Sequence, residues 1–278
     1  MPSRRNFIQS SALALSGSAL LPFSVLAGNP VNGQSMKKEY LKIGMAGYTF
    51  AKYSIEQTIE IMNRVAVNNL SIKDFHLPLD SSQEKINETI AKFKQGGINI
   101  YAVGVIYMKT QAEVDNAFDY AKKVGVDLIV GVPSYDLIEY TEKKVKATNI
   151  KIAIHNHGPE DKQYPGPKDV YDRIYKLDSR VGLCLDIGHA FRAGANLEKV
   201  VTDYAPRIFD LHVKDVTAAA ANAKAIEMGR GAIDFPGFVK ALRSIGYKGS
   251  CSIEFEKDMS DAVPGIAESV GYLKGVMS

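Results

Sequence analysis

The sequence predicts an α/β protein built as a single (β/α)8 TIM barrel, in which parallel strands lie inside a ring of helices. From residue 40 onward, short runs rich in Val, Ile and Leu alternate with amphipathic stretches of about ten to fifteen residues, which is typical of parallel β-α units. Eight such units follow one another over roughly 240 residues without a linker or a repeat. The first strand leads into Gly47-Tyr48-Thr49-Phe50 and not into the glycine-rich phosphate turn that opens a doubly wound sheet, so we favour the barrel.

The eight predicted strands share the apolar composition of strands that are buried on both faces. They are Lys42–Gly47, Leu70–Phe75, Ile98–Ile106, Val126–Val132, Ile150–Asn156, Val181–Ile187, Ile208–Val213 and Gly249–Phe255. The connection from Thr217 to Ala232, after the seventh strand, is longer than the others. In a compact barrel a loop of this length is usually a lid or a binding loop.

The starts of the predicted helices carry capping residues. Ser54 stands three residues before Gln57, a capping-box pattern that begins the first helix. Ser81-Ser82 and Thr110 begin the second and third helices in the same way, and Pro167 suits the first turn of the fifth.

Composition and charge agree with a globular domain. The chain has 278 residues, 46% of them hydrophobic and 23% charged, which excludes collagen, a disordered tail and a disulfide scaffold. Arg4 and Arg5 account for two of the 34 basic residues, so the rest balances 32 against 31 acidic residues and no nucleic-acid partner is expected. Cys184 and Cys251 both lie in apolar strand-like runs, and we expect buried free thiols.

The N-terminal residues read as a secretory signal peptide over residues 1–27. Arg4-Arg5 precede an apolar stretch, and a small-residue cleavage site ends at Ala27. The paired arginines resemble a twin-arginine signal, which exports folded proteins. A membrane-anchoring helix is the alternative, but the apolar stretch is shorter than the roughly 18 residues that a span needs.

These features divide the chain into three parts. We expect the signal peptide over residues 1–27, a linker over residues 28–39 and the barrel over residues 40–278. The protein is then periplasmic or otherwise exported, without a stable membrane anchor. A homo-oligomer is compatible with the sequence, which does not fix the oligomeric state.

The five histidines all fall at or just past the end of a predicted strand. They are His76, His155, His157, His189 and His212. In a barrel the carboxyl ends of the strands converge on one face, where active sites are built. A lone histidine there is usually a packing residue, but five of five indicate a functional site. For His76, lining the pocket and capping the strand-two loop are both open.

Carboxylates accompany the histidines. A charge inside an apolar strand costs several kcal/mol unless it is paired or bound to metal. Asp186, His212 and Glu254 lie on three predicted strands and together suit one divalent ion such as Mn²⁺, Co²⁺, Zn²⁺ or Fe²⁺. The alternative is a buried ion-pair network with Lys214 or Lys248.

Four motifs in this order resemble the xylose-isomerase-like barrels, and in particular the sugar phosphate isomerases/epimerases. The resemblance covers residues 40–276. The motifs are Asp186-Ile187-Gly188-His189, Leu211-His212-Val213-Lys214-Asp215, Gly229-Arg230-Gly231-Ala232-Ile233-Asp234-Phe235 and Ser252-Ile253-Glu254-Phe255-Glu256.

The resemblance implies a divalent metal held by Asp186, His212 and Glu254, and substrate contacts from His189 and Arg230. The family commonly has Glu-Asn-His on strand five, whereas this chain reads His155-Asn156-His157. An imidazole can still complete the metal shell, so we expect His155 as the fourth ligand.

The same departure changes the expected proton transfer. With Glu replaced, a shuttle between two glutamates is in doubt, and Glu254, His155 or His157 is the candidate general base or acid. His76 and Lys214 are further candidate substrate contacts. Export favours an unphosphorylated small carbohydrate.

We therefore expect proton abstraction next to the ketone of a keto-sugar or 3-keto-glycoside, followed by elimination, epimerisation or isomerisation. A metal-dependent hydrolase and a non-catalytic carbohydrate-binding barrel are the alternatives.

Overall fold

The computed structural model describes residues 41–278, and the predicted signal peptide and linker lie outside the described residues. Eight parallel strands close into a barrel in the order β1-β10-β7-β6-β5-β4-β3-β2, which confirms the predicted fold. The barrel strands are β1 (Lys42–Ala46), β2 (Asn69–Ile72), β3 (Asn99–Met108), β4 (Leu128–Pro133), β5 (Lys151–His155), β6 (Val181–Asp186), β7 (Ile208–Val213) and β10 (Ser250–Ile253).

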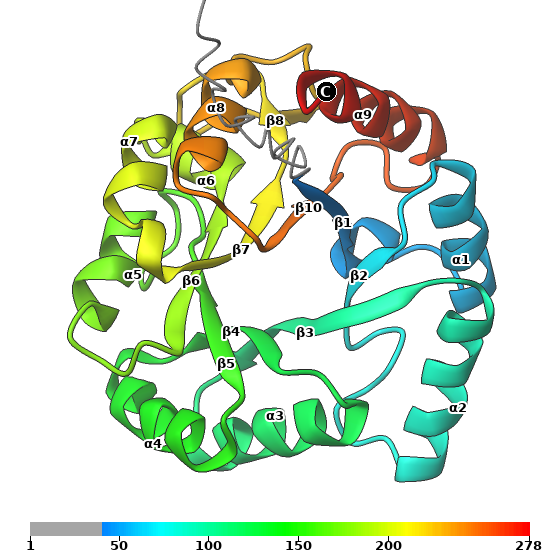
Figure 1. The fold of residues 1–278 in the computed structure, drawn as a ribbon, viewed down its shortest axis with the longest axis vertical. Helices are drawn as coiled ribbons and strands as arrows, with labels where there is room; N and C mark the ends of the chain where they lie inside the picture. The colour runs from blue at the N-terminus through cyan, green and yellow to red at the C-terminus, as the bar shows by residue number, and fades with distance from the viewer. Residues whose placement is uncertain (1–40) are drawn as a thin grey trace, which may run out of the picture. The chain divides into compact units, whose positions relative to one another are not determined.

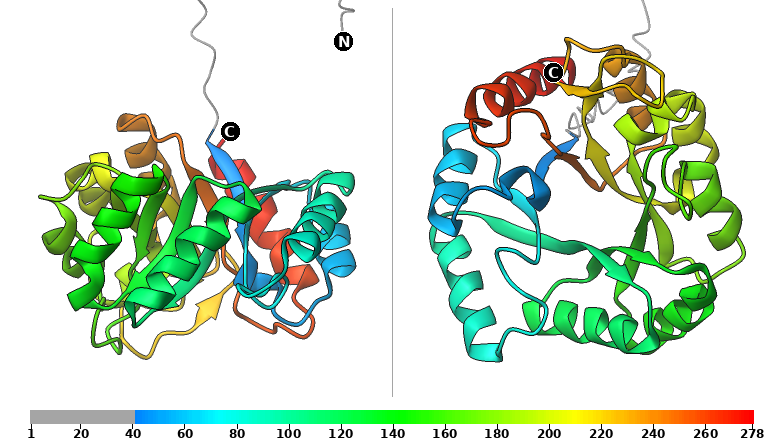
Figure 2. Two further views of the ribbon diagram at one scale, coloured as in Figure 1. Left: turned by 90° about the horizontal axis from the view of Figure 1, so that it is seen from below. Right: turned by 180° about the vertical axis from the view of Figure 1, so that it is seen from behind.

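Helices form the outer layer around these strands (Figures 1 and 2). They are α1 (Ile55–Arg64), α2 (Gln83–Gln95), α3 (Gln111–Val124), α4 (Ile138–Thr148), α5 (Pro167–Ile174), α6 (Ile187–Arg192), α7 (Leu197–Asp203), α8 (Phe235–Ser244) and α9 (Val263–Val276). Ser54 and Thr110 form the predicted capping boxes, and Pro167 opens α5. The last helix closes the ring beside the first, where Lys274 Nζ donates to the carbonyl oxygen of Val65 at 2.9 Å.

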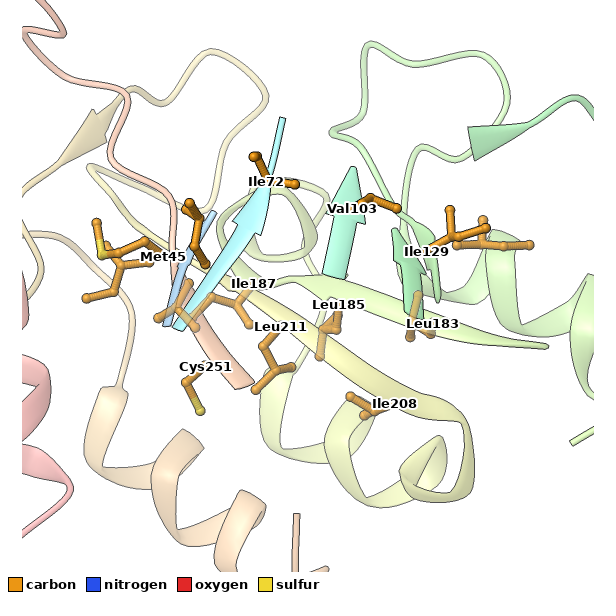
Figure 3. Packing of buried hydrophobic residues seen from close by; sticks show 14 of the residues in the cluster. Met45, Ile72, Val103, Ile129, Leu183, Leu185, Ile187, Ile208, Leu211 and Cys251 are labelled. Atoms are coloured by element: carbon orange, nitrogen blue, oxygen red, sulfur yellow. The ribbon is translucent and has the colours of Figure 1, made fainter. Parts of the chain in front are cut away.

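Alternation along the strands separates an apolar outer face from an inner face that carries polar groups. Leu183, Leu185 and Leu211 belong to the large apolar cluster that the strands share with the helices (Figure 3). Cys184 alternates with the leucines of β6 and packs in a separate cluster with Ala153 and residues of neighbouring strands. Asp186 is two residues further on, so it lies on the inner face at the carboxyl end of β6.

The structure corrects the long connection predicted from Thr217 to Ala232. Strand β9 (Ala225–Ile226) lies within it and pairs antiparallel with β8 (Asp215–Val216). The hairpin extends to Thr217, whose backbone N–H donates to the carbonyl oxygen of Lys224 at 3.0 Å. Backbone pairing therefore gives this segment a defined form on the barrel rim.

Two smaller predictions can be compared with the structure. Cys184 and Cys251 are free and buried, as expected. Strand β2 ends at Ile72 and not at Phe75, so His76 stands four residues past the strand. Within residues 41–278, none of the helices has the length and apolar character to cross a bilayer.

Candidate metal centre and active site

Four side chains meet at the carboxyl ends of neighbouring strands. His155 ends β5, Asp186 ends β6, His212 lies in β7 and Glu254 directly follows β10. All four are buried, and one potential ligand atom from each lies within 4.8 Å of the others. The structure thus brings together the four residues that the sequence predicts as ligands.

The buried donors of this group lack ordinary partners. Both ring nitrogens of His155 and of His212 make no hydrogen bond, and neither does Oδ2 of Asp186. A buried polar atom without a partner costs about 1–3 kcal/mol, so the four ring nitrogens at one place point to a missing ligand. Two imidazoles and two carboxylates are a donor set that suits a divalent ion such as Zn²⁺. The residues present therefore fit a metal ion.

The two oxygens of the Asp186 carboxylate have different surroundings. Oδ1 accepts the backbone N–H of His189 at 2.8 Å and caps the start of α6. Oδ2 faces Nε2 of His155 at 3.5 Å. Asn156, directly after β5, holds the backbone of the same residue, because its side chain accepts the N–H of Asp186 at 3.0 Å and donates to its carbonyl oxygen at 3.2 Å. Sequence reasoning missed the bracing role of Asn156.

Lys214 links the carboxylates of the site. Its buried ammonium lies 3.0 Å from Oδ2 of Asp186, 2.6 Å from Oε2 of Glu254 and 2.7 Å from Oε1 of Glu256. The ion-pair network that was the alternative to a metal is therefore present around Lys214, whereas Lys248 is exposed. The network does not partner the ring nitrogens of His155 and His212, so it does not account for the whole donor set.

Burial and charge set the protonation of the four donors. Burial lowers the pKa of His155 to about 3, which keeps the imidazole neutral and able to ligate. Burial opposes charge on Asp186, but the buried ammonium of Lys214, 3.0 Å from Oδ2, holds its pKa below the ordinary value. Burial likewise opposes charge on Glu254, and Lys214 and His212 outweigh it, so the pKa of Glu254 is also lowered.

His212 behaves differently from the other histidine ligand. Burial acts to lower its pKa, but the neighbouring Cys184 and Glu254 raise it well above the ordinary value. Of these two neighbours, Glu254 is the credible source, since burial raises the pKa of Cys184 to about 12 and leaves the thiol neutral. Metal binding at this site would then release a proton from His212.

A pocket of about 380 Å³ opens beside the four donors, and His189, Lys214 and Glu256 line it together with the β8–β9 hairpin. Burial lowers the pKa of His189 to about 4, so its ring is neutral. His157 lies outside the donor group, with its ring centroid 4.8 Å from that of His155 and its Nε2 2.8 Å from the hydroxyl of Tyr107.

Two predicted substrate contacts are engaged elsewhere. The Nε2 atom of His76 lies 2.9 Å from the carbonyl oxygen of Tyr53 and 3.3 Å from the hydroxyl of Thr58, which favours the capping interpretation of this residue. Arg230 is exposed and pairs with Glu268 on α9, with Nη2 and Oε2 2.7 Å apart.

The Gly229-Arg230-Gly231 motif has a structural role instead. Oδ2 of the buried Asp215 accepts the backbone N–H groups of Gly229 and Gly231 at 2.9 Å each. A Cβ atom on Gly231 would lie 2.2 Å from Oδ1 of Asp215, so a larger residue does not fit there. The motif thus folds the loop around Asp215.

Known proteins resemble this chain at the level of both sequence and fold. The rhizopine catabolism protein MocC of Rhizobium meliloti is 31% identical over 117 residues, which make up 36% of this chain and 36% of that protein. The IolI protein, solved with a zinc atom, matches with a TM-score of 0.69 and 19% identity over 85% of this chain and 96% of that chain. D-psicose 3-epimerase from Clostridium cellulolyticum H10, solved with D-tagatose, matches with a TM-score of 0.68 and 17% identity over 86% of this chain and all of that chain.

At these identities the structural likenesses concern the fold alone. The sequence itself carries the assignment to a family, because the signature of the xylose isomerase-like TIM barrels matches residues 81–276. This stretch contains all four candidate ligands. The chain belongs to the xylose isomerase-like TIM barrel family.

Proposed function

We propose that the protein is a divalent-metal-dependent enzyme that removes a proton next to the ketone of a keto-sugar or 3-keto-glycoside. The observation that carries this proposal is the group of four buried donors with unpartnered ring nitrogens, next to Lys214, which lines a pocket of about 380 Å³. Membership of a family of sugar isomerases, epimerases and dehydratases supports it.

His155, Asp186, His212 and Glu254 would hold the ion. When bound, a divalent ion polarises a carbonyl oxygen and so makes the neighbouring C–H more acidic. Lys214 and His189 line the pocket beside these ligands, and the ring of His189 is placed to hydrogen-bond an oxygen of a sugar.

We assign the role of general base to His157. Among the three candidates His155, His157 and Glu254, it is the one outside the donor group, and its side chain is partly exposed. The hydroxyl of Tyr107 orients its Nε2 atom at 2.8 Å. A base at this place takes a proton from carbon, and epimerisation follows when an acid on the other side of the substrate protonates the opposite face.

Elimination starts from the same proton abstraction. The electron pair left on the α-carbon expels an oxygen substituent from the β-carbon, and the departing oxygen takes a proton from a neighbouring acid. The products are an unsaturated ketone and a free alcohol or sugar. We place this lyase reaction first, because delivery to the periplasm by residues 1–27 would bring the enzyme to glycosides and not to phosphorylated intermediates.

A deuterium-exchange experiment tests the proposal. Protein loaded with Mn²⁺, Co²⁺ or Zn²⁺ is incubated with 3-keto-glucosides in D2O, and deuterium in recovered substrate and the products are measured by NMR and mass spectrometry. We expect exchange at the carbon next to the ketone, and its loss in Asp186→Ala. Cleavage of the parent glucoside without a ketone would favour a hydrolase, and absence of both exchange and product with every keto-sugar would overturn the proposal.

Export is tested separately. Residues 1–27 are fused to a reporter that reaches the periplasm only in the folded state, and Arg4→Lys with Arg5→Lys serves as the matched control. We expect export of the first fusion and retention of the second. Retention of both would contradict a twin-arginine signal.

A further inference from the structure

We propose that Arg192 is a positioning residue that holds His189 in the neutral form with its hydrogen on Nε2, so that this nitrogen donates to a substrate oxygen. The inference rests on the proposed function for its substrate. Its structural part, the form of the imidazole, stands on the contacts of His189 alone.

The two residues are neighbours on the surface of α6. They are three positions apart, and Nη1 of Arg192 lies 3.2 Å from Nδ1 of His189. A guanidinium has only N–H donors and no acceptor. The contact is therefore a hydrogen bond only if Nδ1 carries no hydrogen and accepts.

A second cation approaches the other nitrogen of the same ring. Nζ of Lys214 lies 3.4 Å from Nε2 of His189. A doubly protonated imidazole would set two N–H groups against two cationic donors, so the ring is neutral and accepts from one of them only. Lys214 has shorter contacts, because its ammonium donates to Glu254 and Glu256 at 2.6 and 2.7 Å and forms an ion pair with Asp186 at 3.0 Å. Arg192 is the donor that His189 satisfies.

Arg192 itself is held from two loops. Its Nη1 and Nη2 atoms lie 3.1 and 3.0 Å from the two carboxylate oxygens of Glu160, in the connection between β5 and α5. Its Nε donates to the carbonyl oxygen of Ala221, at the turn of the β8–β9 hairpin, at 3.2 Å. A guanidinium fixed at both of its edges keeps its remaining donor aimed at Nδ1.

The consequence lies on the opposite side of the ring. With Nδ1 as the acceptor, the hydrogen is on Nε2, which points to the ligand carboxylate of Asp186 at 3.9 Å and to the pocket that His189 and Lys214 line. This nitrogen is then a donor beside the place where a sugar oxygen would bind. Arg192 thus contacts both the β8–β9 hairpin, at Ala221, and the imidazole of His189, whose hydrogen position it sets.

Histidine NMR tests the inference without any substrate. The zinc-loaded protein is labelled with ¹⁵N in its imidazole rings, and the His189 signals are assigned by their loss in His189→Asn. We expect the pattern of a neutral ring with the hydrogen on Nε2 in the wild type and in the matched control Lys257→Met, whose residue lines the same pocket but pairs with Glu227. In Arg192→Met we expect a mixture of forms or the hydrogen on Nδ1.

Two NMR outcomes would overturn the inference. One is a wild-type ring with its hydrogen on Nδ1, and the other is an unchanged ring in Arg192→Met. Arg192→Lys keeps a cationic donor and should retain more of the wild-type pattern, which separates a lost hydrogen bond from a general disturbance of α6.

Kinetics connect the form of the ring to the reaction. On a keto-sugar substrate we expect Arg192→Met to lower kcat/KM about 10-fold or more, with Arg192→Lys intermediate, because a hydrogen bond to the substrate is lost. A change in the NMR pattern with unchanged kcat/KM would overturn the functional half of the inference. Absence of activity in the wild type would instead overturn the proposed function and leave the NMR result standing.

Discussion

The inside of the barrel holds two buried polar groups that differ in how they are partnered. The donor group of His155, Asp186, His212 and Glu254 leaves ring nitrogens without hydrogen bonds. The second group lies around Asp210, whose two carboxylate oxygens accept the hydroxyl of Tyr101 at 3.0 and 2.9 Å. Tyr101 is also 2.5 Å from Oγ of Ser252, which donates to Ser250 at 2.9 Å.

Burial does not distinguish these groups, since Asp186 and Asp210 are both fully buried. The protonation of the two carboxyl groups does distinguish them. Burial raises the pKa of Asp210 to about 7, although the hydrogen bond from Tyr101 acts to lower it. Asp186 stays ionised beside Lys214. One group satisfies itself and stabilises the barrel, whereas the other keeps charge and free donors, as a ligand site requires.

The largest expected effect is on metal binding. Asp186→Ala and His212→Ala each remove one of four ligands, so we expect affinity for Zn²⁺ or Co²⁺ to fall by more than the roughly 10–100-fold that loss of an outer partner costs. Equilibrium dialysis with metal analysis measures it. Asp210→Asn is the matched control, because it changes a buried carboxyl of the same strand region outside the donor group. Equal losses in all three variants would remove the distinction between the two groups.

A change in the group around Asp210 should lower stability and leave metal binding unchanged. Tyr101→Phe deletes the hydroxyl that bonds Asp210 and Ser252, so we expect the free energy of unfolding to fall by about 1–3 kcal/mol. Metal affinity should stay at the wild-type value. Denaturant unfolding and dialysis on the same preparation give both quantities, and a weakened metal site in this variant would show that the two groups act as one.

Lys214 allows a finer test of the donor group. Its ammonium lies 3.0 Å from Oδ2 of Asp186, the oxygen that also faces His155. A fixed positive charge at this oxygen repels a divalent cation, so we expect Lys214→Met to bind metal about 10-fold more tightly. The apo variant should be less stable, because Asp186 and Glu254 lose their counter-charge. Lys257→Met is the control, and unchanged or weaker binding in Lys214→Met would mean that Lys214 supports the ligands more than it opposes the ion.

Strand alternation explains how much of this could be predicted from sequence. Residues two apart on parallel strands share a face, and the carboxyl ends converge, so His155, Asp186 and His212 could be placed together without a structure. The directions of side chains that lie beyond the strand ends could not be predicted in this way. Arg230 turns to Glu268 and His76 to Tyr53, because loop geometry and not strand periodicity aims those side chains.

The hydrogen-bond partners of buried residues could not be predicted from the sequence either. Asp210 and His212 are two positions apart in β7 and so share a face of the strand. The hydroxyl of Tyr101, more than 100 positions away along the chain, makes Asp210 a structural residue. Arg192 offered a weak signal, its spacing of three from His189 on a helix. The need for Glu160 and Ala221 to hold it comes from tertiary structure alone.

The smallest expected effect concerns His76. This residue tests whether a buried nitrogen without a hydrogen bond marks a ligand site even when it stands outside the donor group. Its Nδ1 is buried without a partner, as in the donor group, but it stands alone and Nε2 is bonded. Burial lowers the pKa of His76, so between that lowered value and the ordinary value of about 6.5 the unfolded chain binds more protons than the folded one. The contribution of His76 to stability is therefore complete above about pH 6.5 and declines as the pH falls through this window.

His76→Gln removes the titrating group and keeps a polar side chain. In the zinc-loaded protein, where the ligand histidines are tied to the metal, we expect the free energy of unfolding of the wild type to fall more steeply than that of His76→Gln between pH 7 and pH 5. Urea unfolding at a series of pH values measures the difference. Parallel curves would mean that His76 does not titrate on unfolding, and a loss of metal in His76→Gln would mean that an isolated unpartnered nitrogen at the rim also serves the site.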